Sequence, residues 1–472
     1  MKRLILFVVS TCSAWGAIPA AAQWEVRTTG SNANGGFFVT GSGGTDYSQQ
    51  NGAQYTAATA TTSTTTLGVS SGSFTAQMVG NGVQISGGSC TAGFYEITVF
   101  NSAASVTIDR SAGTGSGCTI NVGGGLLTIA TALAPLTAGN TVWIQSGTYT
   151  VTASLSFPAL QASIVGYHTS HGDNASGTRP LITTATNSVP LLVLTTGAAQ
   201  PTLQNLTFST TAGTASTGLS AAGAVTTPVV ILNCLFTGFT TGISFPSPNL
   251  PPALLAYQLE VTGSTGTAAI EMDSSSIAYT MSCLSCYIHD QVGVVYGIYS
   301  NSSSTAIATF SITNTIFKAN AFGAVAVKAN NLVVENCSFF NSSTGGYAIN
   351  LSQVGTAFSA MTVINSVFWG TNSAQGGIIV NSAGQPVYEN WNAIFSSPGT
   401  PRSNITAGPN DVSLTANPWV SATNFQLNNA AGGGALARGK GYPGVFPGGT
   451  TTGYLDMGAV QSQLQVGSAF AN

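Results

Sequence analysis

A short phrase that recurs about every 27 residues dominates the sequence. In five copies an asparagine stands three residues before a phenylalanine, at Asn205, Asn233, Asn314, Asn336 and Asn365. Weaker copies centred on Gln258, Ser285 and Asn392 fill the intervals, although the last copy aligns equally well on Asn390. Successive copies are then 28, 25, 27, 29, 22, 29 and 27 residues apart. This regular period predicts a solenoid in which each repeat stacks on its neighbours.

A second phrase, an apolar residue closing a short alternating segment, follows the first with nearly the same steps. It ends at Leu219, Ile243, Ile270, Ile298, Val325, Ile349 and Ile378. Two strand-like phrases in one period indicate that each repeat is a coil of several short strands. Amphipathic stretches of about ten residues, which a helical repeat needs, are missing from this region. The fold class predicted is therefore all-β, a parallel β solenoid.

The composition agrees with stacked coils, since charged residues make up 5% of the 472 residues, against about 25% in an ordinary soluble domain. In a parallel solenoid equivalent side chains stack about 4.8 Å apart, so a column of like charges would repel. Ten dispersed Lys and Arg residues form no basic patch, which excludes nucleic acid as the main partner. A hydrophobic content of 43% with a net charge of −3 excludes disorder.

The recurrent asparagine is expected to mark a bend, because Asn tolerates a left-handed backbone better than most residues. The aromatic or apolar residue three positions later then points inward. The predicted internal stack consists of Phe208, Phe236, Ile288, Phe317, Phe339, Phe368 and Phe395.

The N-terminus predicts secretion. Lys2 and Arg3 precede an apolar run, and small residues lead up to Ala22, as in a signal peptide that is cut after Ala22. No later segment is apolar for the ~20 residues that a membrane span needs. We therefore expect an extracellular or periplasmic protein without a membrane span.

Six cysteines follow the predicted cleavage point. In an oxidising compartment Cys90 and Cys118 could form a disulfide in the N-terminal region. Cys283 and Cys286 have the spacing of a zinc half-site, but no second pair accompanies them and the repeat register explains both. A zinc site is not expected.

Two segments carry a resemblance to a known superfamily. Residues 138–149 (AGNTVWIQSGTY) resemble the entry coil of right-handed parallel β-helix proteins of the pectin-lyase-like superfamily, and residues 452–460 (TGYLDMGAV) resemble a closing segment of its bacterial secreted members. The resemblance covers roughly residues 126–460. It implies a β-helix with an N-terminal capping helix (126–410) and a C-terminal capping segment (411–472). The predicted signal peptide (1–22) and a small β-rich module (23–125), indicated by a Gly-, Thr- and Ser-rich composition with short strand-like stretches, precede them.

The superfamily includes pectate lyases, polygalacturonases, other polysaccharide lyases and non-catalytic adhesins. The polygalacturonase-like motifs Asn-Thr-Asp, Asp-Asp, Gly-His-Gly and Arg-Ile-Lys do not occur in this sequence, and neither does a pectate-lyase-like Arg-x-Pro-x-x-Arg. The resemblance therefore implies a fold and a polysaccharide partner, but no named activity.

The repeat register picks out one group of candidate residues. Counting outward from the second phrase places Glu271 and Asp273 on one face of one strand, Tyr299 and Asn301 on the next coil and Lys328 on the coil after that. Asn350 follows in the same row as Glu271 and Tyr299.

This group suits polysaccharide chemistry. A lyase must neutralise a uronate carboxylate, often with calcium bound by carboxylates such as Glu271 and Asp273, and must remove the α proton with a base such as Lys328. Calcium is the one cofactor that this chemistry suggests. An inverting hydrolase that uses the two carboxylates as acid and base is the rival mechanism. A solvated ion-pair patch without chemistry is the third interpretation.

A second outward row carries His289, Lys318, Phe340 and Trp369. Its aromatic residues could stack on sugar rings, or the C-terminal segment could cover them. The sequence thus predicts a secreted β-helix protein that binds a polysaccharide, acidic if a lyase acts on it, with lyase-like cleavage as the leading activity. The alternative is a non-catalytic surface or adhesion protein.

Overall fold

The computed structural model describes two compact units, one ending at Trp143 and one beginning at Ile144. The described residues are 18–158, 160–173, 178–186, 190–197, 200–211, 216–246, 250–273, 278–292, 295–301, 307–320, 323–340, 347–352, 360–370, 377–380, 385–395, 401–445 and 452–461. No helix within these ranges is long and apolar enough to cross a membrane. Secretion and the signal peptide stay predictions.

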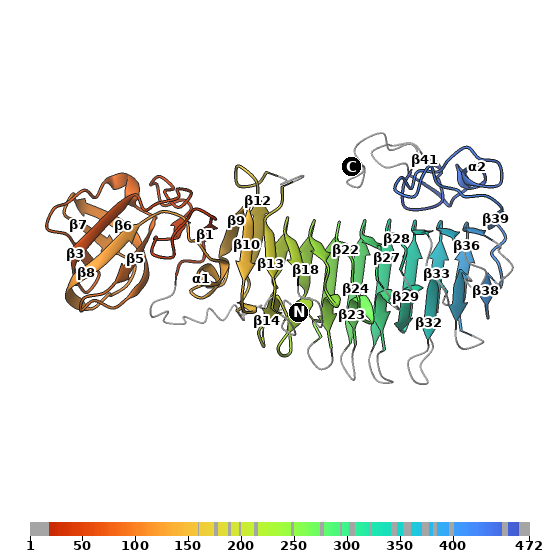
Figure 1. Cartoon of the computed structure of the whole chain (residues 1–472), viewed down its shortest axis with the longest axis horizontal. Coiled ribbons are helices and arrows are strands. Elements are labelled where there is room, and N and C mark those ends of the chain that lie inside the picture. The colour runs from red at the N-terminus through yellow and green to blue at the C-terminus, as the bar shows by residue number, and fades with distance from the viewer. Residues whose placement is uncertain are drawn as a thin grey trace, which may run out of the picture. The chain divides into compact units, whose positions relative to one another are not determined.

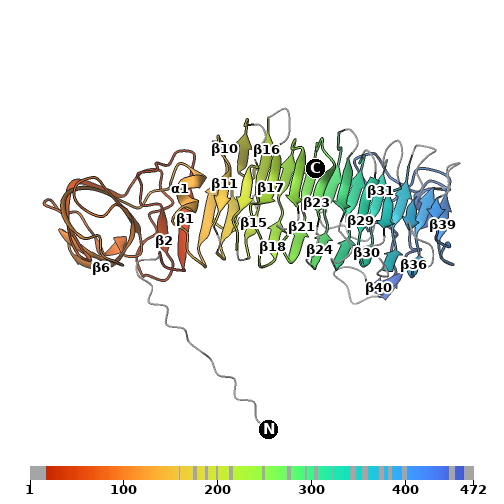
Figure 2. The same cartoon turned by 90° about the horizontal axis from the view of Figure 1, so that it is seen from below.

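The first unit contains a closed antiparallel barrel, whose rounded wall is seen in Figure 2. Its strands follow the order β3-β4-β7-β6-β5-β8. Their bounds are β3 (Tyr55–Ser63), β4 (Thr66–Gly68), β5 (Gly82–Ser86), β6 (Gly93–Ser102), β7 (Ser105–Ile108) and β8 (Thr114–Val122). Alternate residues of these strands fill a core of their own, and Cys90 is joined to Cys118 by a disulfide, the pairing suggested by the sequence.

Shorter elements complete this unit. They are β1 (Ala22–Val26), β2 (Phe37–Val39), the 3-10 helix η1 (Ala76–Met78) and α1 (Ile129–Leu133), while β9 (Thr141–Gln145) spans the division between the units. Helix α1 lies near the start of the 126–410 segment, at whose N-terminus a capping helix is predicted. The side chain of Thr128 caps it by accepting the N–H of Thr131.

The second unit is a parallel β solenoid, which confirms the predicted fold class (Figure 1). Three sheets run along it. From residue 163 onward, sheet 1 contains β12 (Ser163–Tyr167), β15 (Thr202–Gln204), β18 (Val229–Leu232), β21 (Ala253–Tyr257), β24 (Tyr279–Leu284), β27 (Ala308–Thr313), β30 (Asn331–Glu335), β33 (Ala360–Ile364) and β36 (Val387–Asn390).

Sheets 2 and 3 follow the same order along the chain. Sheet 2 consists of β10 (Thr148–Val151), β13 (Leu181–Thr184), β16 (Thr207–Thr210), β19 (Leu235–Thr237), β22 (Glu260–Thr262), β25 (Tyr287–His289), β28 (Ile316–Lys318), β31 (Ser338–Phe340), β34 (Val367–Trp369), β37 (Ala393–Phe395) and β39 (Val412–Leu414). Sheet 3 consists of β11 (Leu155–Phe157), β14 (Leu192–Leu194), β17 (Thr217–Ala221), β20 (Thr241–Phe245), β23 (Ala268–Met272), β26 (Tyr296–Ser300), β29 (Gly323–Lys328), β32 (Ile349–Ser352), β35 (Ile378–Val380) and β38 (Arg402–Ser403).

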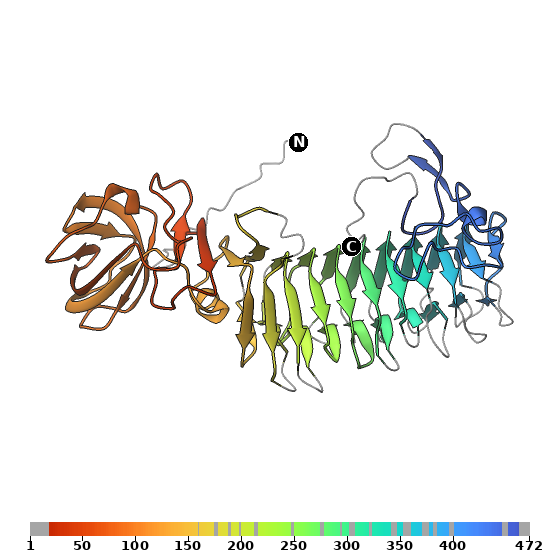
Figure 3. The same ribbon diagram turned by 45° about the horizontal axis from the view of Figure 1, so that its top comes forward.

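The C-terminal segment folds back over the last coils of the solenoid, as Figure 3 shows in blue. It contains α2 (Gly434–Ala437) and a hairpin of β40 (Pro443–Val445) and β41 (Thr452–Tyr454).

The bends between sheets 1 and 2 lie where the sequence predicts them. In seven copies of the first phrase the central residue has a left-handed backbone, with φ between 51° and 56°. These residues are Asn205, Asn233, Gln258, Ser285, Asn314, Asn336 and Asn365. Asn accounts for most of these positions because its short polar side chain lowers the cost of that conformation.

The position predicted for the last bend, Asn392 or Asn390, is wrong by one residue, because Trp391 takes the left-handed conformation with φ 54°. Phe368 therefore pairs with Ile394, which is buried, and Phe395 turns outward beside Trp369. The physical reason lies in Asn392, whose side-chain amide turns inward and donates to the carbonyl of Val363.

Phenylalanine rings form the internal stack as expected in the earlier coils. Ring centroids are 4.7 Å apart between Phe208 and Phe236, 5.1 Å between Phe317 and Phe339, and 4.5 Å between Phe339 and Phe368. Four buried cysteines line the inside of the solenoid, namely Cys234, Cys283, Cys286 and Cys337, and Cys283 forms a disulfide with Cys286.

Candidate functional site

The outward face of sheet 3 brings the first group of predicted residues together. Glu271 pairs with Tyr299 on the next strand, Tyr299 with Ala326, and Ala326 with Asn350. This is the register expected from the repeat. Asp273 directly follows β23, and Lys328 is the last residue of β29.

Glu271 is half-buried on this face. Its Oε2 accepts a hydrogen bond of 3.2 Å from the hydroxyl of Ser244 on the preceding coil. Burial, and then the charge of Asp273, raise the pKa of Glu271 despite the opposing effect of the Ser244 hydrogen bond. The Glu271 carboxyl is thus easier to protonate than an exposed glutamate.

Asp273 is hydrogen-bonded to the next coil. Its Oδ1 accepts the backbone N–H of Asn301 at 2.6 Å, a charge-assisted hydrogen bond between successive coils. This bond fixes the position of the carboxylate beside Glu271.

Two tyrosines of β26 project from the same face. Gly297 and Ile298 are both buried between them, so that Tyr296 and Tyr299 both point outward although they are three residues apart. Their rings stack with centroids 5.1 Å apart and an interplanar angle of 18°. Burial, followed by the charges of Asp273 and Glu271, raises the pKa of Tyr299, which keeps its phenol a hydrogen-bond donor.

Lys328 lies on the next coil and is half-buried. Its strand neighbour in β32 is Ser352. None of the ion pairs between described residues involves Lys328, so the acids of this face and its lysine are not paired with one another.

Among the described residues, this face supplies two carboxylates as possible calcium ligands. Ca²⁺ takes 6–8 oxygen ligands, whereas the face offers the two carboxylates of Glu271 and Asp273, one of which is engaged by Asn301. Over the part of the chain that the structure describes, no group of three or more His, Cys, Asp or Glu residues could hold a metal ion. We therefore assign no step of the chemistry to calcium.

The second predicted group lies on sheet 2 rather than sheet 3. His289 Nε2 lies 3.0 Å from Glu260 Oε1, and His289 Nδ1 lies 2.8 Å from Asp290 Oδ2. Lys318 Nζ donates to the same Asp290 oxygen at 2.9 Å. Burial opposes ionisation of Asp290, but the hydrogen bonds from His289 and Lys318 outweigh it and lower its pKa. His289 and Lys318 are therefore held by neighbouring carboxylates, unlike Lys328 on sheet 3.

The aromatic residues of that row are covered by the C-terminal segment. Phe340 is 7% exposed and packs edge-on against Phe425, with ring centroids 5.9 Å apart. Trp369 is half-buried and packs against the apolar cluster that contains Phe340 and Phe425. Its ring centroid lies 4.2 Å from that of Phe395. Of the two arrangements that the sequence allowed, coverage by the C-terminal segment is the one observed.

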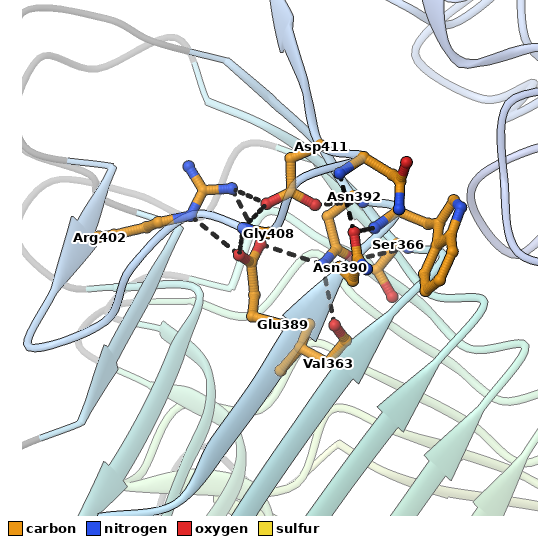
Figure 4. A network of polar contacts seen from close by, with 10 residues as sticks. Val363, Ser366, Glu389, Asn390, Asn392, Arg402, Gly408 and Asp411 are labelled. Atoms are coloured by element: carbon orange, nitrogen blue, oxygen red, sulfur yellow. Dashed lines mark hydrogen bonds and ion pairs between the residues drawn. The ribbon is translucent and has the colours of Figure 1, made fainter. Parts of the chain in front are cut away.

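A third polar cluster was not found by sequence reasoning (Figure 4). Arg402 donates to Glu389 at 2.9 and 3.2 Å and to Asp411 at 2.6 Å. The N–H of Gly408 donates to both carboxylates, and Asn392 contributes its backbone N–H to Asp411 and its amide to Glu389.

The pKa values of the two acids in this cluster are shifted in opposite directions. Burial, and then the neighbouring Glu389, raise the pKa of Asp411 to about 7. Burial opposes ionisation of Glu389 too, but hydrogen bonds from Asp411 and Arg402 lower its pKa. The Glu389 and Asp411 side chains are 1% and 7% exposed, so the cluster fastens the end of the solenoid and offers a polymer little surface. Glu389 and Arg402 lie on strands of different sheets, and Asp411 lies outside both strands, so no single row of the repeat places these three side chains together.

Comparison with known proteins supplies neighbours in fold. No protein-family model and no curated protein matches the chain. Two solved structures of the PL6 family alginate lyase AlyGC, one of a mutant, match at 14% identity. Their TM-scores are 0.41 and 0.40, and they cover 61% and 60% of this chain. The matched part of this chain spans 38% of the length of each alginate lyase chain.

A third match is the catalytic domain of a GH87 alpha-1,3-glucanase in complex with tetrasaccharides. It has 10% identity and a TM-score of 0.25, and covers 76% of this chain and 90% of the other. At these values none of the matches bears on the chemistry of this protein.

Proposed function

We propose that this protein binds an extracellular polysaccharide along the outward face of sheet 3 and cleaves it there by lyase-like elimination. The observation that carries the proposal is the gathering of Glu271, Asp273, Tyr299 and Lys328 on successive strands of one face, in a chain with 5% charged residues. The scarcity of charge elsewhere makes such a gathering informative.

The face has the features that sugar binding requires. The stacked rings of Tyr296 and Tyr299 provide an aromatic platform with polar hydroxyls. The exposed Asn301 lies beside this platform. Neighbouring strands are about 4.8 Å apart, so an extended polymer lying along the solenoid would meet equivalent side chains at regular intervals.

Elimination at a uronate needs a group that neutralises the carboxylate, a base and an acid. Glu271, with its raised pKa, would donate a hydrogen bond from its protonated carboxyl to the substrate carboxylate. Lys328 would act as the base that takes the proton α to the carboxylate. Tyr299 would donate its phenolic proton to the departing glycosidic oxygen.

Hydrolysis is the second candidate, because the environments of the two acids differ. Glu271 has a raised pKa and suits a general acid, while Asp273 accepts the Asn301 N–H and suits a base that activates water. The products distinguish the two reactions, since elimination forms an unsaturated sugar and hydrolysis forms a reducing end without one.

The test is to incubate the full-length protein with pectate, alginate, glycosaminoglycans and neutral glucans, with and without calcium. Ultraviolet absorbance reports unsaturated products, and a reducing-sugar assay reports total cleavage. If the reaction is elimination, Lys328→Ala should lower the rate at least ~100-fold, in the range expected for loss of a general base. If the reaction is hydrolysis, Asp273→Ala should have that effect. Lys440→Ala and Glu335→Ala, which change exposed and half-buried charges away from this face, are the matched controls.

Each outcome decides between the interpretations. If no polysaccharide yields a product, the enzymatic proposal is wrong, and binding without cleavage would favour the adhesion alternative. If cleavage survives both Lys328→Ala and Asp273→Ala, the activity stands but this face is not its site.

A further inference from the structure

A groove of about 560 Å³ opens in the barrel of the first unit. One wall is the first part of β3, Tyr55–Thr59, and the other is the segment 69–73 that follows β4. Its volume falls within the range of small-ligand sites. The groove belongs to a unit with its own core, so it is independent of the face on sheet 3.

The groove arises because β3 lacks a partner strand along part of one edge. On one side β3 pairs with β8 from Tyr55 to Ser63. On the other side β4 pairs with β3 at residues 61–63. The edge of residues 55–60 therefore faces the groove, and its backbone groups there are available to a ligand.

A β-bulge shapes this wall. The pairing of β3 with β8 shifts register between Ala57 and Ala60, which adds one residue to β3 at Ala58 and Thr59. Both residues are exposed and line the groove. Bulges of this kind redirect side chains and are common beside binding sites.

The opposite wall is held in place by the turn between β6 and β7. The N–H of Val69 donates to Ala104 at 3.0 Å, and the N–H of Phe74 donates to Ala103 at 3.1 Å. Gly72, which lies between Val69 and Phe74 in the chain, is so close to this turn that a Cβ on it would lie 2.0 Å from the carbonyl oxygen of Ala103. A residue other than glycine would push this wall out of place.

Tyr55 joins the two walls. Its hydroxyl donates to the carbonyl of Ser71 at 3.1 Å, and its ring packs edge-on against Phe74 with centroids 5.0 Å apart. With both walls tied, the groove is formed before any ligand binds, which lowers the entropic cost of binding.

The lining is neutral and rich in hydroxyl groups. None of the ten lining residues is charged, and every polar side chain among them is a hydroxyl: Tyr55, Thr56, Thr59, Ser70, Ser71 and Ser73. Hydroxyls donate and accept, as sugar hydroxyls do. A charged ligand would find no charged side chain to compensate its lost hydration.

We propose that this groove binds a short segment of a neutral polysaccharide and gives the protein a second carbohydrate-binding surface, separate from sheet 3. The groove would anchor the barrel on a neutral glycan while sheet 3 engages its own substrate. The inference does not depend on the activity proposed for sheet 3.

The experiment measures binding of the full-length protein to neutral glucans, xylan and mannan by affinity electrophoresis and by titration calorimetry with their oligosaccharides. Ala58→Arg and Ser70→Arg place a long cation into the groove from opposite walls. Each should weaken binding at least tenfold without lowering the melting temperature. Val99→Arg, at a 49% exposed position on β6 outside the groove, should bind as the wild type does.

Three results would overturn the proposal. They are failure of the wild type to bind any neutral glycan, unchanged binding in both groove variants, and binding of extended peptides in place of sugars. The peptide result would show that the free edge of β3 accepts a strand instead. Lys328→Ala and Asp273→Ala should retain this binding, so failure of the groove and failure of sheet 3 are told apart.

Discussion

Replacing Arg402 with leucine removes the cation that lies between two buried carboxylates at the end of the solenoid. Its guanidinium makes three hydrogen bonds, of 2.6 to 3.2 Å, to Glu389 and Asp411. Leucine keeps part of the aliphatic volume but leaves both acids without a counter-charge. The substitution therefore isolates the electrostatic contribution of Arg402.

The structure sets the size of the effect. Removing one partner of a buried ion pair costs about 3–5 kcal/mol. Because the Arg402 side chain is itself 14% exposed, we expect the lower end, about 3 kcal/mol. The loss should be concentrated in the last coils, where Gly408 and Asn392 complete the network.

The deficit should also depend on pH. The pKa of Asp411 is raised to about 7, so the folded state binds a proton there more tightly than the unfolded chain does. The stabilisation that this bound proton gives the folded state is fully present below the ordinary pKa of aspartate, and it is lost as the pH rises towards 7. Without Arg402 the two carboxylates repel without compensation, so the deficit of the variant should be larger at pH 8 than at pH 5.

Urea denaturation combined with hydrogen exchange of residues 401–414 measures both effects. Arg179→Leu is the control, because Arg179 donates to the neutral amide of Asn233. Combining Arg402→Leu with Glu389→Gln and Asp411→Asn should recover much of the loss. A deficit below about 1 kcal/mol, or one that is the same at pH 5 and pH 8, would refute the assignment of this cluster as an electrostatic fastening.

Three further perturbations test the core and the barrel. Phe339→Ala should destabilise the solenoid by about 3–5 kcal/mol in urea denaturation, because its ring is 1% exposed and stacked on both sides, whereas Phe395→Ala at the outward position should cost clearly less. Cys118→Ser opens the 28-residue loop closed with Cys90 and should lower barrel stability by about 3–4 kcal/mol, seen as a lower melting temperature that added reductant does not lower further. Burial, and then Asp109, raise the pKa of Glu96 to about 7, so barrel stability should fall between pH 5 and pH 8 by up to about 3 kcal/mol, and Glu96→Gln should abolish this slope.

The sequence alone determined the coil architecture and the rows on its faces. The bends at the recurrent rungs, the inward phenylalanines and the pairing of Glu271 with Tyr299 all follow from a period of about 27 residues. These features could be predicted because each coil contacts only its neighbours and does so in the same way, so the same local sequence pattern recurs in coil after coil.

Tertiary structure decided what lies outside that period. It moved the last bend to Trp391, placed Phe425 over Phe340 and assembled the Glu389 cluster from residues on non-equivalent positions. It also left the edge of β3 open in the barrel. Contacts of this kind join segments that share no repeat, and burial and hydrogen bonding between such segments are settled only when the whole chain has packed.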